Sequence, residues 1–329
     1  MQSLYIFCII DQYARMNTRI SNNMNKVAME VKEEQLDVPW GHIAVKVYGP
    51  QNEKKILMVH GIMDNAGSFD RLLNHLPQDY HYVCIDLPGH GLSSAFPPGM
   101  PLNFWDYIYS IFLVLDTLQW KTCTYIGHSL GAQIGIYFSI LYPQRLEKII
   151  AVDGFLPYLV DNSISYIQKI YNLNSYAKDS KALYTKDEAI YSLKCRRQES
   201  LTTEAAEALF SRAVTKVGNL YKYNRDTRLR MVFRPIFTIR QHMEFLEKFS
   251  TRMLVIIADS SSRFYLLSEM LELTKGIMKE KEVSKVMVRG NHDVHNNYPE
   301  RLAELLCIPH CLVKSHFLAH LLVILLYDS

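Results

Sequence analysis

The sequence lacks a large excess of charge of either sign: 36 Lys and Arg residues stand against 33 Asp and Glu, a formal net charge of +3. It also lacks any run of basic residues interleaved with aromatics. Both absences argue against a dedicated nucleic-acid-binding protein. No internal repeat or low-complexity segment stands out in the 329 residues, of which 49% are hydrophobic. We therefore expect one large domain, or one domain with an insertion.

Cysteine is scarce, and its positions lack the spacing of a disulfide framework. The six cysteines are scattered, and Cys84 and Cys123 fall in or beside predicted buried strands. This pattern is typical of reduced thiols in an intracellular protein. No set of cysteines and histidines completes a tetrahedral site, so we expect no metal there.

A run long enough to span a bilayer is missing as well. Residues 3–10 are apolar but short, without a preceding basic residue or a cleavage site, so they are not a convincing signal peptide. The leucine-rich stretch 312–327 carries Lys314, His316 and His320. Spanning takes about 20 largely uncharged residues. The expected location is intracellular: cytoplasmic, peroxisomal or vesicle-associated, with membrane association through this tail as an alternative.

Short apolar segments alternate with helix-like segments from residue 43 onward. This alternation is typical of a parallel α/β sheet, and near-continuous apolar runs indicate strands covered on both faces. Helical spacing of large residues predicts helices at 105–118 and 130–141. Strands are predicted at 43–48, 56–59, 82–85, 124–126, 149–152, 253–258 and 286–288.

The alternation of strands stops between residues 154 and 235. There Thr202, followed by acidic residues, predicts a capped helix. The interruption leaves the sheet at the carboxyl end of a strand, where α/β folds place their ligands, so a helical cap is expected rather than a linker. The predicted organisation is an N-terminal extension at 1–38, expected to be disordered, a core at 39–153 and 236–306, the cap at 154–235, and an atypical apolar tail at 307–329.

The pentapeptide GHSLG at residues 127–131 joins an apolar strand to an apolar helix. A Gly-x-Ser-x-Gly motif in this context is the signature of a nucleophile elbow. The flanking glycines allow a turn so tight that Ser129 is pushed above the sheet. The alternative is a serine in an ordinary strand-to-helix turn.

A serine hydroxyl becomes a strong nucleophile only when a base takes its proton. In enzymes with this elbow the histidine comes last in chain order, after the final strand. His292 lies in the short loop that begins at Gly290, after the predicted strand at 286–288, so we predict His292 as the base. His295 is the competitor in the same loop, and its alternative role is packing.

The acid that orients the histidine is ambiguous in the sequence. Asp153 ends the strand that follows the nucleophile helix, and Asp259 ends the later strand at 253–258. We place Asp153 first and keep Asp259 as the alternative acid. The oxyanion of an acyl-transfer intermediate needs two backbone amides. Leu130, after the nucleophile, and Ile62, in the loop after the strand at 56–59, are the predicted donors.

Together these motifs resemble the α/β-hydrolase superfamily, and in particular the serine hydrolase-like proteins, sometimes called Kraken-type hydrolases. The resemblance covers about residues 39–306 and is carried by segments 60–70, 86–94, 97–101, 127–131, 223–226 and 290–300. It implies a Ser/His/acid hydrolase with a helical cap and no cofactor. Relatives that cleave haloalkanes or epoxides carry a carboxylate at the elbow, so Ser129 implies acyl transfer. In some of those relatives the acid follows the strand after the nucleophile helix, which favours Asp153.

The predicted function is hydrolysis of a carboxylic ester, as in carboxylesterases and lipases, through an acyl-enzyme on Ser129 with His292 as the general base; the expected partner is a small-molecule acyl substrate. Thioesters and amides are further candidates for the substrate. The alternative is a non-catalytic protein of the same fold that binds a ligand or partner. The sequence names neither the acyl group, nor the leaving group, nor the oligomeric state.

Overall fold

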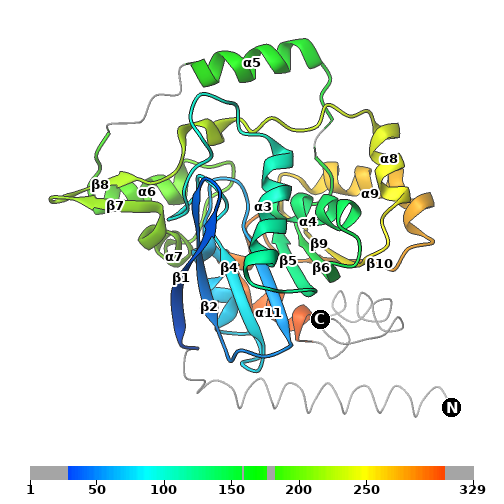
Figure 1. Ribbon diagram of the computed structural model, residues 1–329, viewed down its shortest axis with the longest axis horizontal. Helices are drawn as coiled ribbons and strands as arrows, with labels where there is room; N and C mark the ends of the chain where they lie inside the picture. Colours follow the sequence, from blue (N-terminus) through cyan, green and yellow to red (C-terminus); the bar gives the residue numbers. More distant parts are fainter. Residues whose placement is uncertain (1–28, 158, 176–181, 308–329) are drawn as a thin grey trace. The chain divides into compact units, whose positions relative to one another are not determined.

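The computed structural model describes residues 29–157, 159–175 and 182–307 (Figure 1). Every element below belongs to one compact unit that begins at Val31. The predictions made on the apolar segment 3–10 and on most of the tail at 307–329 lie outside the described residues. Within the described ranges, no helix has the length and apolar character needed to cross a membrane.

An eight-stranded sheet forms the centre of this unit, in the order β1-β2-β4-β3-β5-β6-β9-β10. β2 pairs antiparallel with β1 and with β4, and all other neighbouring strands are parallel. The mostly parallel α/β sheet expected from the sequence is therefore confirmed, with a strand at each predicted position. The bounds are β1 Val31–Val38, β2 Gly41–Tyr48, β3 Lys55–Val59, β4 His81–Ile85, β5 Cys123–His128, β6 Leu146–Val152, β9 Arg252–Ala258 and β10 Val283–Val288.

The sheet begins earlier than the predicted core boundary at residue 39. Val31–Val38, assigned to a disordered extension, instead form β1, which pairs along its full length with β2. The prediction failed because the outer strand is mostly exposed and lacks the apolar run of the central strands. Its Leu36 packs inward, so the pairing adds to the core.

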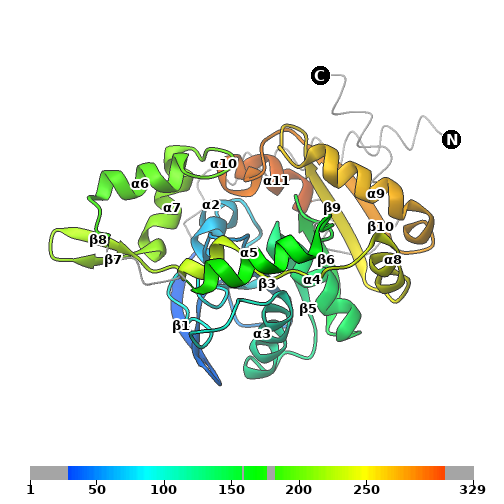
Figure 2. The same cartoon turned by 90° about the horizontal axis from the view of Figure 1, so that it is seen from above.

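Helices cover both faces of the sheet. Figure 2 shows α3 and α4 on one face and α2, α10 and α11 on the other. The bounds outside the segment 154–235 are η1 Ala66–Phe69, α2 Asp70–Leu73, α3 Phe104–Thr117, α4 Leu130–Leu141, α8 Ile239–Glu247, α9 Phe264–Met278, α10 Val294–Asn297 and α11 Pro299–Leu306. The two predicted helices at 105–118 and 130–141 correspond to α3 and α4.

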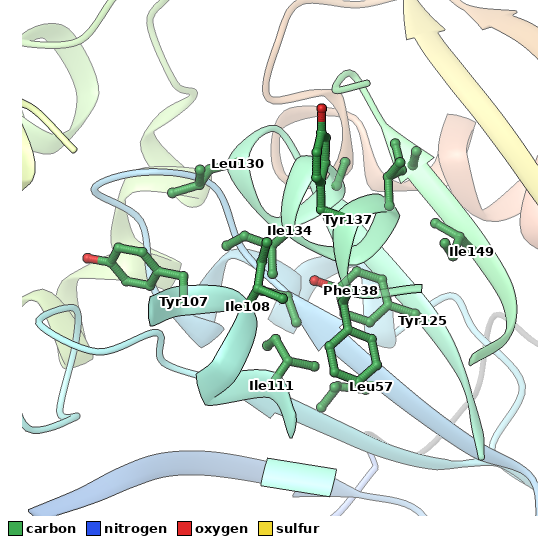
Figure 3. Close-up of a cluster of buried hydrophobic side chains, with 14 of the residues drawn as sticks. Leu57, Tyr107, Ile108, Ile111, Tyr125, Leu130, Ile134, Tyr137, Phe138 and Ile149 are labelled. Carbon is green, nitrogen blue, oxygen red and sulfur yellow. The ribbon is translucent and has the colours of Figure 1, made fainter. Parts of the chain in front are cut away.

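The core that supports the elbow lies between α3, α4 and the central strands (Figure 3). Ile134 and Phe138 of α4 are fully buried, and so is Tyr125 of β5. The Tyr125 hydroxyl donates to the carbonyl of Gly131 at 2.7 Å, which ties the strand to the first turn of α4. Burying side chains of this size stabilises the fold by about 1.5–3 kcal/mol each. The strand and helix on either side of Ser129 are thus held rigidly together.

Residues 154–235, called the insertion here, consist of helices and a small hairpin. The bounds are α5 Ser163–Ser175, α6 Lys186–Cys195, α7 Thr203–Ala213, β7 Val214–Val217, β8 Leu220–Tyr223 and η2 Thr227–Arg230. Thr202 caps α7 as predicted, accepting from the Ala205 amide at 3.2 Å. The antiparallel β7–β8 hairpin was not predicted, since its strands are only four residues long and partly exposed. In Figure 1, α6, α7 and the hairpin group together while α5 lies apart.

Buried charges fasten the insertion to the sheet. Arg212 of α7 is 2% exposed and pairs with Asp86, after β4, at 2.8 Å, and its guanidinium also contacts Glu33 of β1. Arg228 donates to three backbone carbonyls in the loop after β4, those of Phe96, Pro97 and Met100. A guanidinium can serve several fixed acceptors at once. These contacts fix the insertion against the loops at the carboxyl ends of the strands.

Candidate active site

Ser129 occupies a strained turn between β5 and α4. Its backbone has φ 52° and ψ −112°, which a residue with a side chain adopts only when its surroundings impose it. Gly131 is required on the helix side, because a Cβ there would lie 2.2 Å from the Val59 carbonyl oxygen. The predicted elbow geometry is present. Ser129 itself is 2% exposed, and α4 begins at the next residue.

The structure brings Ser129, His292 and Asp153 together from three loops. His292 Nε2 lies 3.0 Å from Ser129 Oγ, and His292 Nδ1 lies 2.6 Å from Asp153 Oδ2. Relative exposures are 2%, 9% and 0% respectively. With the Nδ1 proton donated to the carboxylate, Nε2 can accept the serine proton. These side chains come together because β5, β6 and β9 are parallel and end at the same edge of the sheet. There His128 pairs with Val152, and Val152 pairs with Ile256.

Two further donors hold the Asp153 carboxylate. The Ala258 amide donates to Oδ1 at 3.0 Å, and the Ser261 hydroxyl donates to Oδ2 at 2.6 Å. Asp259 is placed differently: it is exposed, and its Oδ1 accepts from the Gly290 amide at 3.0 Å and from the Ser260 hydroxyl at 2.8 Å. Of the two aspartates kept open from the sequence, Asp153 contacts His292, whereas Asp259 serves the loop around Gly290.

The residues predicted to supply the oxyanion amides lie beside the nucleophile. Leu130 is the first residue of α4, and amides in a first helical turn have no partner within the helix. Ile62 follows Gly61, where a Cβ would lie 3.1 Å from the Ser129 Cβ. The chain at Gly61 therefore packs directly against the elbow. The donor roles of Ile62 and Leu130 stay a prediction.

Three buried histidines surround the site without titrating near neutral pH. Burial lowers the pKa of His60 to about 4 and that of His295 to about 3. Burial, with the neighbouring His295 and His292, holds the pKa of His128 well below its usual range. His60 accepts from the Leu87 amide at 3.0 Å, and the His295 ring lies 4.1 Å from the His128 ring. His60 and His295 therefore have packing roles, and His292 is the histidine placed on Ser129.

Arg263, just before α9, was missed by the sequence reasoning. Its Nη1 donates to Ser129 Oγ at 3.3 Å. Its own amide donates to Ser261 Oγ at 3.1 Å, and the same hydroxyl binds Asp153. A cation at this distance favours negative charge on Oγ. No motif predicts it, because the loop conformation alone brings the guanidinium to the serine.

Glu199 of the insertion was also missed, although it contacts both loops of the site. Its Oε2 accepts from the His292 amide at 2.7 Å, and its Oε1 accepts from the Ser262 amide at 2.6 Å. Burial would raise the pKa of Glu199, but these hydrogen bonds and the nearby His292 lower it. The carboxylate thus links the loop that carries His292 to the loop beside Asp153. Its position between α6 and α7 gave no sequence signal.

Arg197 lies between two buried carboxylates next to the site. It binds Asp64 at 3.0 Å and Asp293 at 2.6 Å. Burial would raise the pKa of Asp64, but Arg197 holds it below its usual range, whereas burial raises the pKa of Asp293 to about 6 despite Arg197. Among the described residues, Asp64, His128 and Asp293 have the proximity of metal ligands. The guanidinium already supplies the positive charge between the two carboxylates.

The family comparisons agree with this architecture. The family model for the alpha/beta hydrolase fold matches residues 54–192. A serine hydrolase-like protein of Danio rerio is 31% identical over 87% of this chain and 89% of its own length. Serine hydrolase-like protein 2 of Homo sapiens is 33% identical over 84% of this chain and 93% of its own length.

Solved structures show the same fold at lower identity. A thioesterase domain from the curacin biosynthetic pathway superposes with a TM-score of 0.72 at 20% identity, covering 84% of this chain and 99% of that domain. A hypothetical protein from Pseudomonas aeruginosa PAO1 gives 0.70 at 24% identity, covering 84% and 99%. With its sheet, its elbow and relatives matched over most of their length, the chain belongs to the serine hydrolase-like proteins of the α/β-hydrolase superfamily.

Proposed function

We propose that the protein hydrolyses the ester bond of a small acyl substrate, through an acyl-enzyme on Ser129. The observation that carries the proposal is the hydrogen-bonded chain from Ser129 Oγ through His292 to Asp153, at 3.0 and 2.6 Å. Nucleophile, base and orienting acid within such distances constitute the arrangement that acyl transfer needs. All three are buried, which strengthens the electrostatic interactions among them.

In this mechanism Ser129 Oγ attacks the substrate carbonyl while its proton passes to His292 Nε2. Asp153 stabilises the imidazolium that forms, and the Ile62 and Leu130 amides stabilise the oxyanion. Collapse of the intermediate expels the alcohol, which takes the proton from His292. Water then repeats the attack on the acyl-enzyme with His292 as base, and Ser129 is regenerated. The Arg263 guanidinium, 3.3 Å from Oγ, favours the charge that develops on the serine.

Fluorophosphonate labelling tests this function, because the probe reacts with an activated serine. We expect wild type to be labelled, Ser129→Ala to remain unlabelled, and Ser139→Ala to behave as wild type. Ser139 is a matched control: it is buried in the same helix, and its hydroxyl donates to the Ile136 carbonyl. A folded wild type that neither labels nor cleaves 4-nitrophenyl esters would instead support a non-catalytic binding protein.

A further inference from the structure

A cleft of about 1060 Å³ lies between the insertion and the core loops that follow β3 and β4. On the core side it is lined by Met63 and by the loop that includes Phe96, and on the insertion side by β7, β8 and η2. Met63 directly follows Ile62, so the cleft begins one residue from an amide proposed to bind the oxyanion. Ligand sites usually occupy about 300–1,000 Å³, so the cleft can hold a sizeable part of a substrate.

The lining of this cleft is basic. Among the described residues it includes Lys222, Arg225, Arg228 and Arg230, with Asp226 as its carboxylate. Arg228 binds that carboxylate at 2.6 Å, so Asp226 is already neutralised. Within the part of the chain that the structure describes, neither Arg225 nor Arg230 forms an ion pair with a carboxylate. In the described part of the lining, the positive charges of Arg225 and Arg230 are therefore not balanced by a paired carboxylate.

Arg225 and Arg230 also act on one another. Arg225 is exposed, and its pKa is lowered by partial burial and by the positive charges of Arg230 and Arg197, which Tyr223 opposes. The Arg225 guanidinium carbon lies 4.8 Å from the centre of the Tyr223 ring, a cation–π distance. Holding cations together costs free energy that an anion between them would recover. A guanidinium fork matches the oxygens of phosphate and carboxylate groups.

Apolar walls flank these charges. The Trp40 and Phe96 rings, 4.8 Å apart, lie on the core side, and the Tyr184 and Tyr223 rings, 5.4 Å apart, lie on the insertion side. Such walls suit the apolar body of a ligand, while a few polar groups fix its orientation. We propose that this cleft binds an anionic group, a phosphate or a carboxylate, of the substrate cleaved at Ser129, with Arg225 and Arg230 as its ligands.

That the bound anion belongs to the substrate cleaved at Ser129 rests on the proposed function. Anion binding itself does not, so it is measured first in Ser129→Ala protein, which cannot form the acyl-enzyme. Calorimetric titration compares 4′-phosphopantetheine with pantetheine, which differ by one phosphate. If the bound group is a phosphate, the phosphorylated compound should bind about tenfold tighter, the effect of one charge-assisted pair. The preference should vanish in Arg225→Gln/Arg230→Gln. It should persist in Lys216→Gln/Lys248→Gln, which removes two exposed cations outside the cleft lining.

Kinetics with the active protein distinguish the two sources of negative charge. The phosphate arm compares butyryl thioesters of 4′-phosphopantetheine and pantetheine, and the carboxylate arm compares monophenyl adipate with phenyl hexanoate. In one of the two pairs, we expect the charged substrate to have a KM about tenfold lower than its neutral partner. This difference should disappear in Arg225→Gln/Arg230→Gln, because the KM of the charged substrate rises while that of the neutral substrate does not change. The preferred pair identifies the group.

The two proposals fail in different ways. The cleft assignment would be overturned if all four substrates were hydrolysed without a preference for the charged ones, or if such a preference survived in Arg225→Gln/Arg230→Gln. The proposed hydrolase function would still stand. Absence of both labelling and hydrolysis, with selective binding of 4′-phosphopantetheine, would overturn the proposed function and keep the anion site. Equal binding of both pantetheines, together with equal KM values in the carboxylate pair, would overturn the inference.

Discussion

The two halves of the candidate site are built differently. The nucleophile half is local and apolar: β5, Ser129 and α4 are consecutive, and α4 has a buried core of large side chains. The acid–base half is assembled from distant segments by polar contacts. Asp153 and His292 are 139 residues apart in sequence, and Glu199 of the insertion binds the His292 amide.

The two halves differ in the contacts that hold their side chains in position. Ser129 is held by backbone strain and packing within one strand–turn–helix unit, which other regions perturb little. His292 lies on a loop whose position depends on Glu199, and the adjacent Asp293 depends on Arg197. We therefore expect substitutions in the insertion to disturb the base more than the nucleophile.

The largest expected effect separates the two candidate acids. Asp153→Asn should lower turnover of an ester by about four orders of magnitude, because the imidazole loses the carboxylate that orients it and stabilises its charge. Asp259→Asn should retain most of the activity, because its side chain contacts the loop around Gly290. Steady-state kinetics of both variants measure the difference. Equal losses would contradict the assignment made from the geometry.

Next in size is the effect of Arg197→Ala on stability. Its removal leaves Asp64 and Asp293, which are 3% and 2% exposed, without their cation. Stranding a buried charge costs about 3–5 kcal/mol in the free energy of unfolding. Urea denaturation measures this loss. Arg240→Ala is the control: Arg240 is 87% exposed in its pair with Glu244, and an exposed pair contributes about 1 kcal/mol or less.

A second substitution sharpens the same test. Adding Asp293→Asn to Arg197→Ala removes one of the two stranded charges and should recover part of the lost stability. If Arg197→Ala were no more destabilising than Arg240→Ala, the two carboxylates would not depend on the guanidinium. The insertion would then be held by its other contacts, such as the pair of Arg212 with Asp86.

A smaller effect is expected for Glu199→Gln, a positioning residue acting through His292. We expect kcat to fall about tenfold with KM little changed, the result of a slightly misplaced base. Glu207→Gln, exposed on α7, is the control. An unchanged kcat in Glu199→Gln would reduce Glu199 to a structural contact.

The buried histidines near the site make stability depend on pH. Burial lowers the pKa of His60 to about 4, and that of His90 and His295 to about 3. In the unfolded chain each of these histidines has a pKa of about 6.5, so it binds a proton at a higher pH than in the folded protein. The free energy of unfolding therefore falls as the pH drops below about 6.5, by up to about 1.4 kcal/mol per histidine per pH unit. The raised pKa of Asp293, about 6, opposes this between about pH 4 and 6.

Unfolding measured from pH 7 to 4 tests this balance. His295→Gln should flatten the dependence of stability on pH by about one proton, since that position no longer titrates in the unfolded chain. His75→Gln, at an exposed position, is the control. A wild-type protein equally stable at both ends of this range would show that the buried histidines do not remain neutral in the fold.

The sequence predicted the fold and the elbow at Ser129 well because both depend on local patterns. Apolar runs placed the central strands, and glycines on either side of Ser129 marked the elbow. It did not predict the β7–β8 hairpin or β1, because short or exposed strands leave little periodicity to read. Glu199 and Arg263 were invisible for a different reason: their contacts join segments separated by 93 and 134 residues.

By itself the sequence determined that a serine stands at a strand-to-helix elbow, with a histidine after the last strand and two aspartates as candidate partners. Only the tertiary structure decided between them. The ends of β6 and β9 are adjacent, so Asp153 and Asp259 directly follow neighbouring strands, and sequence order cannot say which carboxylate turns toward His292. Asp153 does so because Ala258 and Ser261 hold it there, while Asp259 bonds to Gly290.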